Sequence, residues 1–266
     1  MTVSLLKKNN VSLHGFGSKV MIFSHGYGCS KSMWRLIAPS FFDTHKVVLL
    51  DLVGSGNSDT TAYDFDKYST LDAYADDIIE LCESQNWSSI VFVGHSVSSM
   101  IGVLFAKKRP DLISELIMIG PSPCYINKES YEGGFSESDI HELLDSMDSN
   151  YLGWSSFITP VIMNNPDRPE LTEELKNSFC RTEPAIAKHF GSVTFLSDNR
   201  DDLKYVKTKS LIIQSEIDSI APVYVGNYIS EQITNAQFKL IDTVGHCPHL
   251  SHPEKTIEAM KIFLFS

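Results

Sequence analysis

The sequence contains no cluster of basic residues and no apolar run long enough to span a membrane. Its 266 residues include 22 Lys and Arg against 33 Asp and Glu, which gives a formal net charge of -11 at pH 7. This balance argues against nucleic acids and membranes as partners, because both present anionic surfaces that bind clustered Lys and Arg. The first ten residues also lack the apolar core of a signal peptide. We therefore expect a soluble, cytoplasmic protein.

Cysteine is scarce, and no two cysteines form a Cys-x-x-Cys pair. The five are odd in number and widely scattered: Cys29, Cys82, Cys124, Cys180 and Cys247. This distribution is typical of reduced thiols rather than of a disulfide framework. Cys29 and Cys247 fall near the site described below, where we expect them to act as small buried apolar residues.

Two motifs that would hold a cofactor or a metal are incomplete. Gly54 and Gly56 follow a strand-like run, but the third glycine of a dinucleotide-binding turn is missing and no helical pattern opens there. Three histidines lie within residues 246–252, yet Pro248 and Pro253 oppose a continuous helix and no cluster of carboxylates accompanies them. We expect neither a cofactor nor a metal.

The sequence does contain a serine at a strand-to-helix turn. The apolar, β-branched run over residues 90–93 ends at Gly94, and a helical pattern of apolar residues begins at Val97. Ser96 therefore lies on a nucleophile elbow, a turn tight enough to expose the hydroxyl and to point the following N–H at the atom that the hydroxyl attacks. The usual motif is Gly-x-Ser-x-Gly, and here Ser98 takes the place of the second glycine.

Strand patterns and helix patterns alternate along the first 120 residues and again after residue 209. Strands are expected at 11–14, 19–23, 46–51, 90–94, 115–120, 210–215 and 238–242, and helices at 68–84, 97–108, after Pro222 and at 253–263. This alternation predicts an α/β fold with a mostly parallel sheet flanked by helices. Ligands of such sheets bind at the carboxyl ends of the strands, where His25, Asp51 and Ser96 all stand.

The strand pattern disappears after residue 123. Helices are expected at 137–149, 151–163, 170–178 and 183–189, separated by glycine- and proline-containing breaks. This pattern predicts a four-helix cap of residues 124–190 inserted into a core of residues 1–123 and 191–266. The cap is rich in aromatic residues, some of which can line a pocket above Ser96.

A serine hydroxyl becomes a good nucleophile when a histidine accepts its proton and an acid orients that histidine. After a nucleophile elbow, the acid and then the histidine are expected at the ends of later strands. Asp218 lies just past one such strand, and His246 lies in the loop after the last. Glu216 is closer to its strand end, and Asp242 is still within the last strand and too near His246 in sequence. We therefore predict Ser96, Asp218 and His246 as the catalytic triad.

The second half of the expected site is the loop Ser24-His25-Gly26-Tyr27-Gly28, which follows a buried strand. A glycine loop of this kind leaves backbone N–H groups free, and the N–H of Tyr27 would form an oxyanion hole together with the N–H of Val97. An ordinary glycine turn would explain the loop by itself. Its position relative to the elbow and to Gly245-His246 favours the catalytic interpretation.

The sequence resembles the α/β-hydrolase fold. Within that fold, Gly94-His95-Ser96-Val97-Ser98-Ser99-Met100-Ile101-Gly102 is similar to the elbow of RsbQ, a bacterial regulator of the sigma-B stress response, and of the plant karrikin and strigolactone receptors. The similarity covers almost the whole chain, including residues 68–72, 109–112, 133–135, 149–151 and 218–222. Residues 121–125, 166–170 and 245–253 are more similar to the bacterial member.

The resemblance implies a cap of four helices over a closed apolar pocket, with Phe135, Trp154 and Phe195 in its wall. It also implies Tyr27 and Val97 as the oxyanion donors. Members of this group more often have phenylalanine where Tyr27 stands, so the additional phenol is expected either to narrow the pocket or to hydrogen-bond a ligand.

Residues and resemblance together predict a serine hydrolase that binds and slowly hydrolyses a small apolar ester or lactone. By resemblance to RsbQ, the protein would regulate stress signalling through a PAS-containing, PP2C-type phosphatase. Two alternatives stay open. One is a plain metabolic esterase or lactonase, and the other is a cofactor-free haloperoxidase or C–C hydrolase that uses the same triad.

Overall fold

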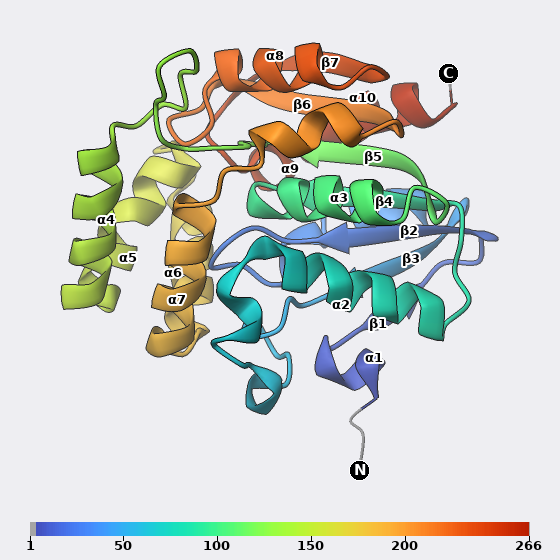
Figure 1. The fold of residues 1–266 in the computed structure, drawn as a ribbon, viewed down its shortest axis with the longest axis horizontal. Coiled ribbons are helices and arrows are strands. Elements are labelled where there is room, and N and C mark those ends of the chain that lie inside the picture. Colours follow the sequence, from blue (N-terminus) through green and yellow to red (C-terminus); the bar gives the residue numbers. More distant parts are fainter. Residues whose placement is uncertain (1–3, 266) are drawn as a thin grey trace.

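A seven-stranded sheet forms the centre of the computed structural model, which describes residues 4–265 (Figure 1). The strands are β1 (Ser12–His14), β2 (Lys19–Ser24), β3 (His45–Leu50), β4 (Ile90–His95), β5 (Ile113–Ile119), β6 (Lys209–Ile217) and β7 (Ala236–Val244). Their order in the sheet is β1-β3-β2-β4-β5-β6-β7, with β1 antiparallel to β3 and every other pair parallel. The predicted α/β class with a mostly parallel sheet is confirmed.

Helices connect these strands. The α-helices are α1 (Leu5–Lys8), α2 (Leu71–Ser84), α3 (Val97–Lys108), α4 (Glu137–Ser149), α5 (Tyr151–Met163), α6 (Pro169–Arg181), α7 (Pro184–Phe195), α8 (Val223–Gln232), α9 (Pro248–Ser251) and α10 (Pro253–Phe265). Short 3-10 helices are η1 (Lys31–Trp34), η2 (Ala38–Phe41), η3 (Thr60–Ala62), η4 (Lys67–Ser69) and η5 (Arg200–Tyr205). Helices α2 and α3 lie side by side against the sheet, as Figure 1 shows. None of the helices within residues 4–265 is long and apolar enough to cross a membrane.

The central strand β4 and the helix that follows it are buried together. All six residues of β4 are buried, and so are ten of the twelve residues of α3. Gly102 allows this close packing, because a Cβ at that position would lie 2.6 Å from Leu116 Cδ1 and 2.7 Å from Phe92 Cδ1. Strand β4 and helix α3 therefore form a rigid base for the turn between them.

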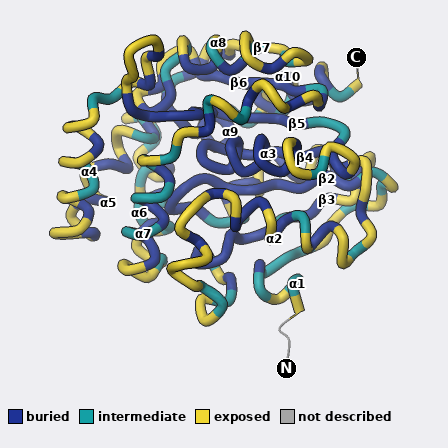
Figure 2. The backbone as a smooth tube through the Cα atoms, in the orientation of Figure 1, coloured by how far each residue is buried: buried dark blue, intermediate teal, exposed yellow. Residues whose placement is uncertain are grey.

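Helices α4 to α7 are inserted between β5 and β6 and lie beyond the carboxyl ends of the parallel strands (Figure 1). Their outer surfaces are exposed, whereas the sheet is buried (Figure 2). Helices α4 and α5 have the bounds expected from the sequence. The proposed division of the chain stays a prediction; its residues 1–3 and 266 lie outside the described residues.

Four helices differ from their expected bounds. Helix α6 covers residues 169–181 instead of 170–178, and α10 ends at Phe265 instead of Phe263. The helix expected at 68–84 begins at Leu71, because Thr70 has an extended backbone with φ of -139° and ψ of 163°. The helix expected to end at His189 continues to Phe195 and includes Gly191. A Cβ on Gly191 would lie 2.6 Å from Met147 Cε, so this glycine serves close packing of α7 against α4 rather than ending the helix.

Candidate active site

The turn after β4 holds Ser96 in a strained conformation. Its φ of 55° and ψ of -122° lie in a region that residues with side chains rarely adopt, and the surrounding packing must compensate for this strain. Gly94 permits the turn, because a Cβ there would lie 2.4 Å from the carbonyl oxygen of Ser98. The sharp turn places the Ser96 hydroxyl at the carboxyl end of β4, where only 6% of the residue is exposed.

Ser98 explains why the second glycine of the usual elbow motif can be replaced. Its hydroxyl donates a hydrogen bond of 2.5 Å to the carbonyl oxygen of His25 and lies 2.8 Å from Ser24 Oγ. Both partners belong to the end of β2 and the loop that follows. Ser98 therefore fastens the elbow helix α3 to the neighbouring glycine loop.

The three residues predicted as a triad lie in one line of hydrogen bonds at the carboxyl ends of β4, β6 and β7. His246 Nε2 lies 2.9 Å from Ser96 Oγ, and His246 Nδ1 lies 2.8 Å from Asp218 Oδ2. Ser96 and His246 are 150 residues apart in sequence, so only the sheet brings them together. With Nδ1–H donated to the carboxylate, Nε2 is free to accept the serine proton.

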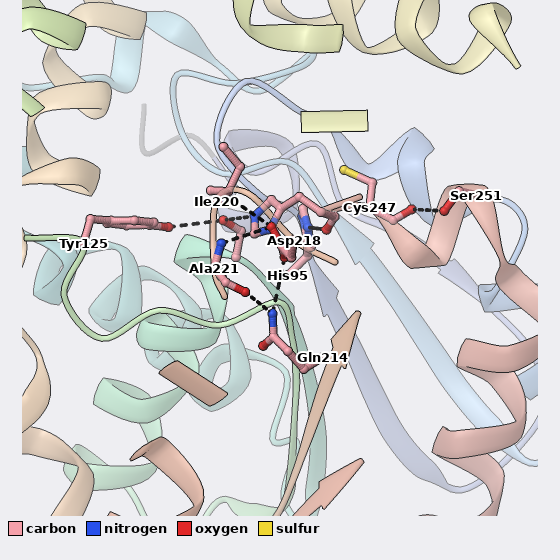
Figure 3. A network of polar contacts seen from close by, with 10 residues as sticks. His95, Tyr125, Gln214, Asp218, Ile220, Ala221, Cys247 and Ser251 are labelled. Atoms are coloured by element: carbon pink, nitrogen blue, oxygen red, sulfur yellow. Dashed lines mark hydrogen bonds and ion pairs between the residues drawn. The ribbon is translucent and has the colours of Figure 1, made fainter. Parts of the chain in front are cut away.

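Asp218 is itself fixed by the loop after β6. Its Oδ1 accepts hydrogen bonds from the N–H groups of Ile220 at 2.8 Å and Ala221 at 3.0 Å, and Gln214 Nε2 donates to its Oδ2 at 3.3 Å (Figure 3). The two other acids considered above point elsewhere. Glu216 is exposed on β6, and Asp242 is exposed on β7 and pairs with Lys255.

The backbone N–H groups of Tyr27 and Val97 have no hydrogen-bond acceptor within residues 4–265. Buried N–H groups are rarely left unpaired, so two of them beside the serine are available to an oxygen of a ligand. Gly26 lets the loop approach the elbow, because a Cβ there would lie 2.5 Å from His95 Nδ1 and 3.3 Å from Ser96 Cβ.

A cavity of about 90 Å³ lies directly above Ser96, between the strand ends and the inserted helices. We call the strand-end side the floor and helices α4 to α7 the roof. All three predicted pocket residues, Phe135, Trp154 and Phe195, line the cavity. Most of the remaining wall is apolar, with Leu143, Ile158, Val161, Ile162, Leu175 and Phe179.

A few polar groups also line the cavity. Besides Ser96 and His246, Thr194 on α7 contributes a fully buried hydroxyl that has no hydrogen-bond partner within the described residues. The ring of Tyr27 lines the cavity as well, but its hydroxyl donates a hydrogen bond of 2.8 Å to the carbonyl oxygen of Ala187 in the roof. The phenol therefore donates its hydrogen bond to the protein, and whether it narrows the pocket stays a prediction.

Tyr125 is a site residue that the sequence did not single out. Its hydroxyl lies 3.4 Å from Ser96 Oγ, and burial raises its pKa to about 12, so it stays protonated near neutral pH (Figure 3). In the sequence, Tyr125 is one of several aromatic residues of the expected cap. Its position six residues after the end of β5, near the strand ends, was the available signal.

His95, Cys247 and His249 form a buried group whose potential ligand atoms lie within 4.8 Å of one another. His95 is poorly placed to bind a metal there. Its Nε2 donates to the carbonyl oxygen of His246 at 2.9 Å, and its Nδ1 is closely approached by Gly26. Burial lowers the pKa of His95 well below its usual value and that of His249 to about 3, so both rings stay neutral beside the triad.

A profile of the alpha/beta hydrolase family matches residues 21–259. The chain is 35% identical over 253 residues to the karrikin insensitive 2 receptor CA of Petunia hybrida, covering 95% of this chain and 94% of that protein. It is 34% identical over 259 residues to the strigolactone esterase D14 of Arabidopsis thaliana, covering 97% of each. A solved structure of a hydrolase from Oleispira antarctica is similar with a TM-score of 0.96 and 38% identity, over 99% of this chain and 97% of that one.

Proposed function

Because the chain belongs to the alpha/beta hydrolase family and, within it, to the group of karrikin receptors and strigolactone esterases, we propose that it hydrolyses small lactones or esters through Ser96. The observation that carries this proposal is the hydrogen-bonded line from Asp218 through His246 to Ser96 on the floor of an apolar cavity. Two unpaired backbone N–H groups beside the serine provide the remaining requirement for acyl transfer.

In the proposed reaction, Ser96 Oγ attacks the carbonyl carbon of the substrate while His246 Nε2 takes the hydroxyl proton. Asp218 stabilises the imidazolium that forms, and the N–H groups of Tyr27 and Val97 donate to the oxyanion. The ester C–O bond then breaks, and His246 returns the proton to the leaving oxygen. In a lactone this oxygen remains attached to the acyl group. Water, deprotonated by His246, then attacks the acyl-serine. The acyl–Oγ bond breaks as His246 returns this proton to Ser96 Oγ, and the hydroxy acid is released.

The size of the cavity favours a small substrate. Its volume of about 90 Å³ is well below the roughly 300–1,000 Å³ of pockets that enclose drug-sized ligands. The apolar wall suits a single small ring, such as a lactone, whose carbonyl is its main polar group. Ser96 is almost fully buried beneath the roof, and movement of the roof would widen the way to it, which is consistent with slow turnover.

The direct test incubates the protein with a panel of small lactones and with p-nitrophenyl acetate. Mass spectrometry is expected to detect the hydroxy acid from at least one lactone, and Ser96→Ala protein serves as the matched blank. A wild-type yield no higher than that of Ser96→Ala, with both proteins folded, would reject the proposal. Fast turnover of many simple esters would instead indicate a plain esterase, and bromination by wild type alone would indicate haloperoxidase chemistry.

We also propose a regulatory role, in which a PAS-containing, PP2C-type phosphatase binds the protein. Support comes from the resemblance to RsbQ and from α5, which exposes Leu152 and Phe157 while Val161 on the same helix lines the cavity. A partner on α5 would therefore be sensitive to what the pocket holds. Size-exclusion chromatography with a purified phosphatase of this class, with and without a bound lactone, is expected to show a complex that Phe157→Ala weakens. Separate elution in both conditions would count against this role.

A further inference from the structure

Tyr27 is the residue through which the floor of the pocket contacts every helix of the roof. Its ring packs against Trp154 on α5 and Phe179 on α6, with centroid distances of 6.2 Å and 5.5 Å. Its hydroxyl lies 3.1 Å from Met147 Sδ on α4 and donates to the carbonyl oxygen of Ala187 on α7. Two further rings of α7, those of Phe190 and Phe195, lie 5.7 Å and 5.8 Å away.

The backbone of Tyr27, by contrast, makes few hydrogen bonds of its own. Its neighbours in the chain are both glycines, and Gly28 has a φ of 69°. Across this turn the Cys29 N–H donates to the Gly26 carbonyl oxygen at 3.2 Å, and His25 Nδ1 lies 2.8 Å from the same oxygen. Neither bond involves the N–H or the carbonyl group of Tyr27. Glycine-flanked backbone has more conformational freedom than other backbone. The direction of the Tyr27 N–H therefore depends on where the side chain is held.

We propose that the Tyr27 hydroxyl is a positioning group for the oxyanion hole: its bond to Ala187 fixes the side chain against α7 and thereby aims the Tyr27 N–H at the oxyanion. This inference rests on the proposed hydrolytic function and assigns a regulatory contact within it. Movement of α7 away from the floor would break the bond and disorder one of the two oxyanion donors. The hole is then complete only when the roof is closed.

The surroundings keep this contact in place while the roof is closed. Burial raises the pKa of the Tyr27 phenol well above its usual value, so the hydroxyl retains its proton at every physiological pH. Gly191, one turn further along α7, leaves space for the phenol, because a Cβ there would lie 3.2 Å from the hydroxyl oxygen. A phenylalanine at position 27 would keep the ring contacts and the N–H but lose the bond to α7.

The chain contains a matched control for this contact. The Tyr63 hydroxyl also bonds to α7, at 2.8 Å from His189 Nδ1. Tyr63 lies just after η3 and outside both the triad and the oxyanion loop. Tyr63→Phe therefore removes a floor-to-α7 hydrogen bond of similar length without touching the residue that donates to the oxyanion.

The test compares Tyr27→Phe, Tyr63→Phe and wild type in three measurements. The first is hydrolysis of p-nitrophenyl acetate, the second is the affinity for ethaneboronic acid, which forms a tetrahedral adduct on a catalytic serine, and the third is hydrogen–deuterium exchange in α7. Tyr27→Phe is expected to lower kcat and weaken boronate binding by about threefold to tenfold, the loss that corresponds to one hydrogen bond. KM should change less than about twofold, because the oxyanion hole acts on the transition state.

Tyr63→Phe is expected to increase exchange in α7 while leaving kcat and boronate affinity unchanged. The inference is overturned if Tyr27→Phe has wild-type kcat and boronate affinity, or if Tyr63→Phe lowers both to the same extent, since either result would make the bond a simple anchor of the roof. These outcomes are separate from failure of the proposed function, which would appear as wild-type activity that Ser96→Ala retains.

Discussion

The floor and the roof of the pocket are held together by different interactions. On the floor, Ser96, His246 and Asp218 are fixed by directional hydrogen bonds of 2.8 to 2.9 Å at the ends of β4, β7 and β6. In the roof, helices α4 to α7 meet through apolar and aromatic side chains, and the cavity wall that they supply is almost free of polar groups. Directional bonds fix atoms to a fraction of an ångström, whereas apolar packing fixes a volume. The floor therefore supplies the reacting groups. The roof determines what can reach them and, in the inference drawn above, holds Tyr27 and its oxyanion donor in place.

The strongest test of this division removes the nucleophile and leaves the apolar pocket unchanged. Ser96→Ala deletes one hydroxyl from the floor and leaves the roof intact, so turnover should fall by roughly a thousandfold or more. Binding of a non-hydrolysed apolar ligand, followed by tryptophan fluorescence through Trp154 beside the cavity, should stay within about twofold of wild type, because apolar binding follows the area buried. Loss of ligand binding in folded Ser96→Ala protein would show that floor and roof are not separable.

The converse test substitutes a residue of the roof. Trp154→Ala removes a large buried wall residue, so KM for small esters should rise by about tenfold and the protein should lose about 3 kcal/mol of stability. Reactivity of Ser96 towards a small fluorophosphonate should persist. Phe157→Ala is the matched control, because Phe157 lies on the same helix and is 72% exposed. Equal effects of both substitutions on KM would contradict the assignment of the cavity.

The sequence predicts the residues of the floor better than the packing of the roof. Strand ends are marked by local signals. A glycine near the end of an apolar run marks the positions of Ser96 and His246, and Asp218 was placed because it lies just past an apolar run. The roof has no such markers. The periodicity that predicted α4 and α5 does not state which apolar face meets which neighbour, so the partners of Tyr27 and the cavity position of Tyr125 emerge only when distant segments pack. The role of Gly191 could not be predicted for the same reason, because it depends on a close contact with α4 that no local sequence pattern indicates.

The pH dependence of stability tests whether the buried His249 beneath the floor stays neutral. His249 packs against Trp34 and His95, and burial lowers its pKa to about 3, below the ordinary value of 6.5. Between these two pH values the unfolded chain binds a proton that the folded protein does not, so stability falls as the pH drops below about 6.5. His249→Gln should make that decline shallower by about 1.4 kcal/mol per pH unit in urea unfolding. His141→Gln, on the exposed surface of α4, is the control, and equal slopes for wild type and His249→Gln would contradict the buried neutral ring.

The smallest effect concerns a buried hydroxyl of the roof. Thr194 Oγ1 lies in the cavity wall without a partner among the residues that the structure describes, and an unpaired buried hydroxyl is destabilising. Thr194→Val should therefore raise the free energy of unfolding by about 1 kcal/mol and lower KM for purely apolar esters. Thermal unfolding and steady-state kinetics check both. A rise in KM for such esters would instead indicate that the hydroxyl already contacts the substrate.

The account depends most directly on Ser96 being the group that reacts. Intact-mass spectrometry and peptide mapping after treatment with a small fluorophosphonate test this in one measurement. The expected result is a single adduct on Ser96 in wild type, none on folded Ser96→Ala, and much slower labelling of His246→Ala, since His246 activates the hydroxyl. An adduct on another residue, or equal labelling of Ser96→Ala, would contradict the proposed nucleophile.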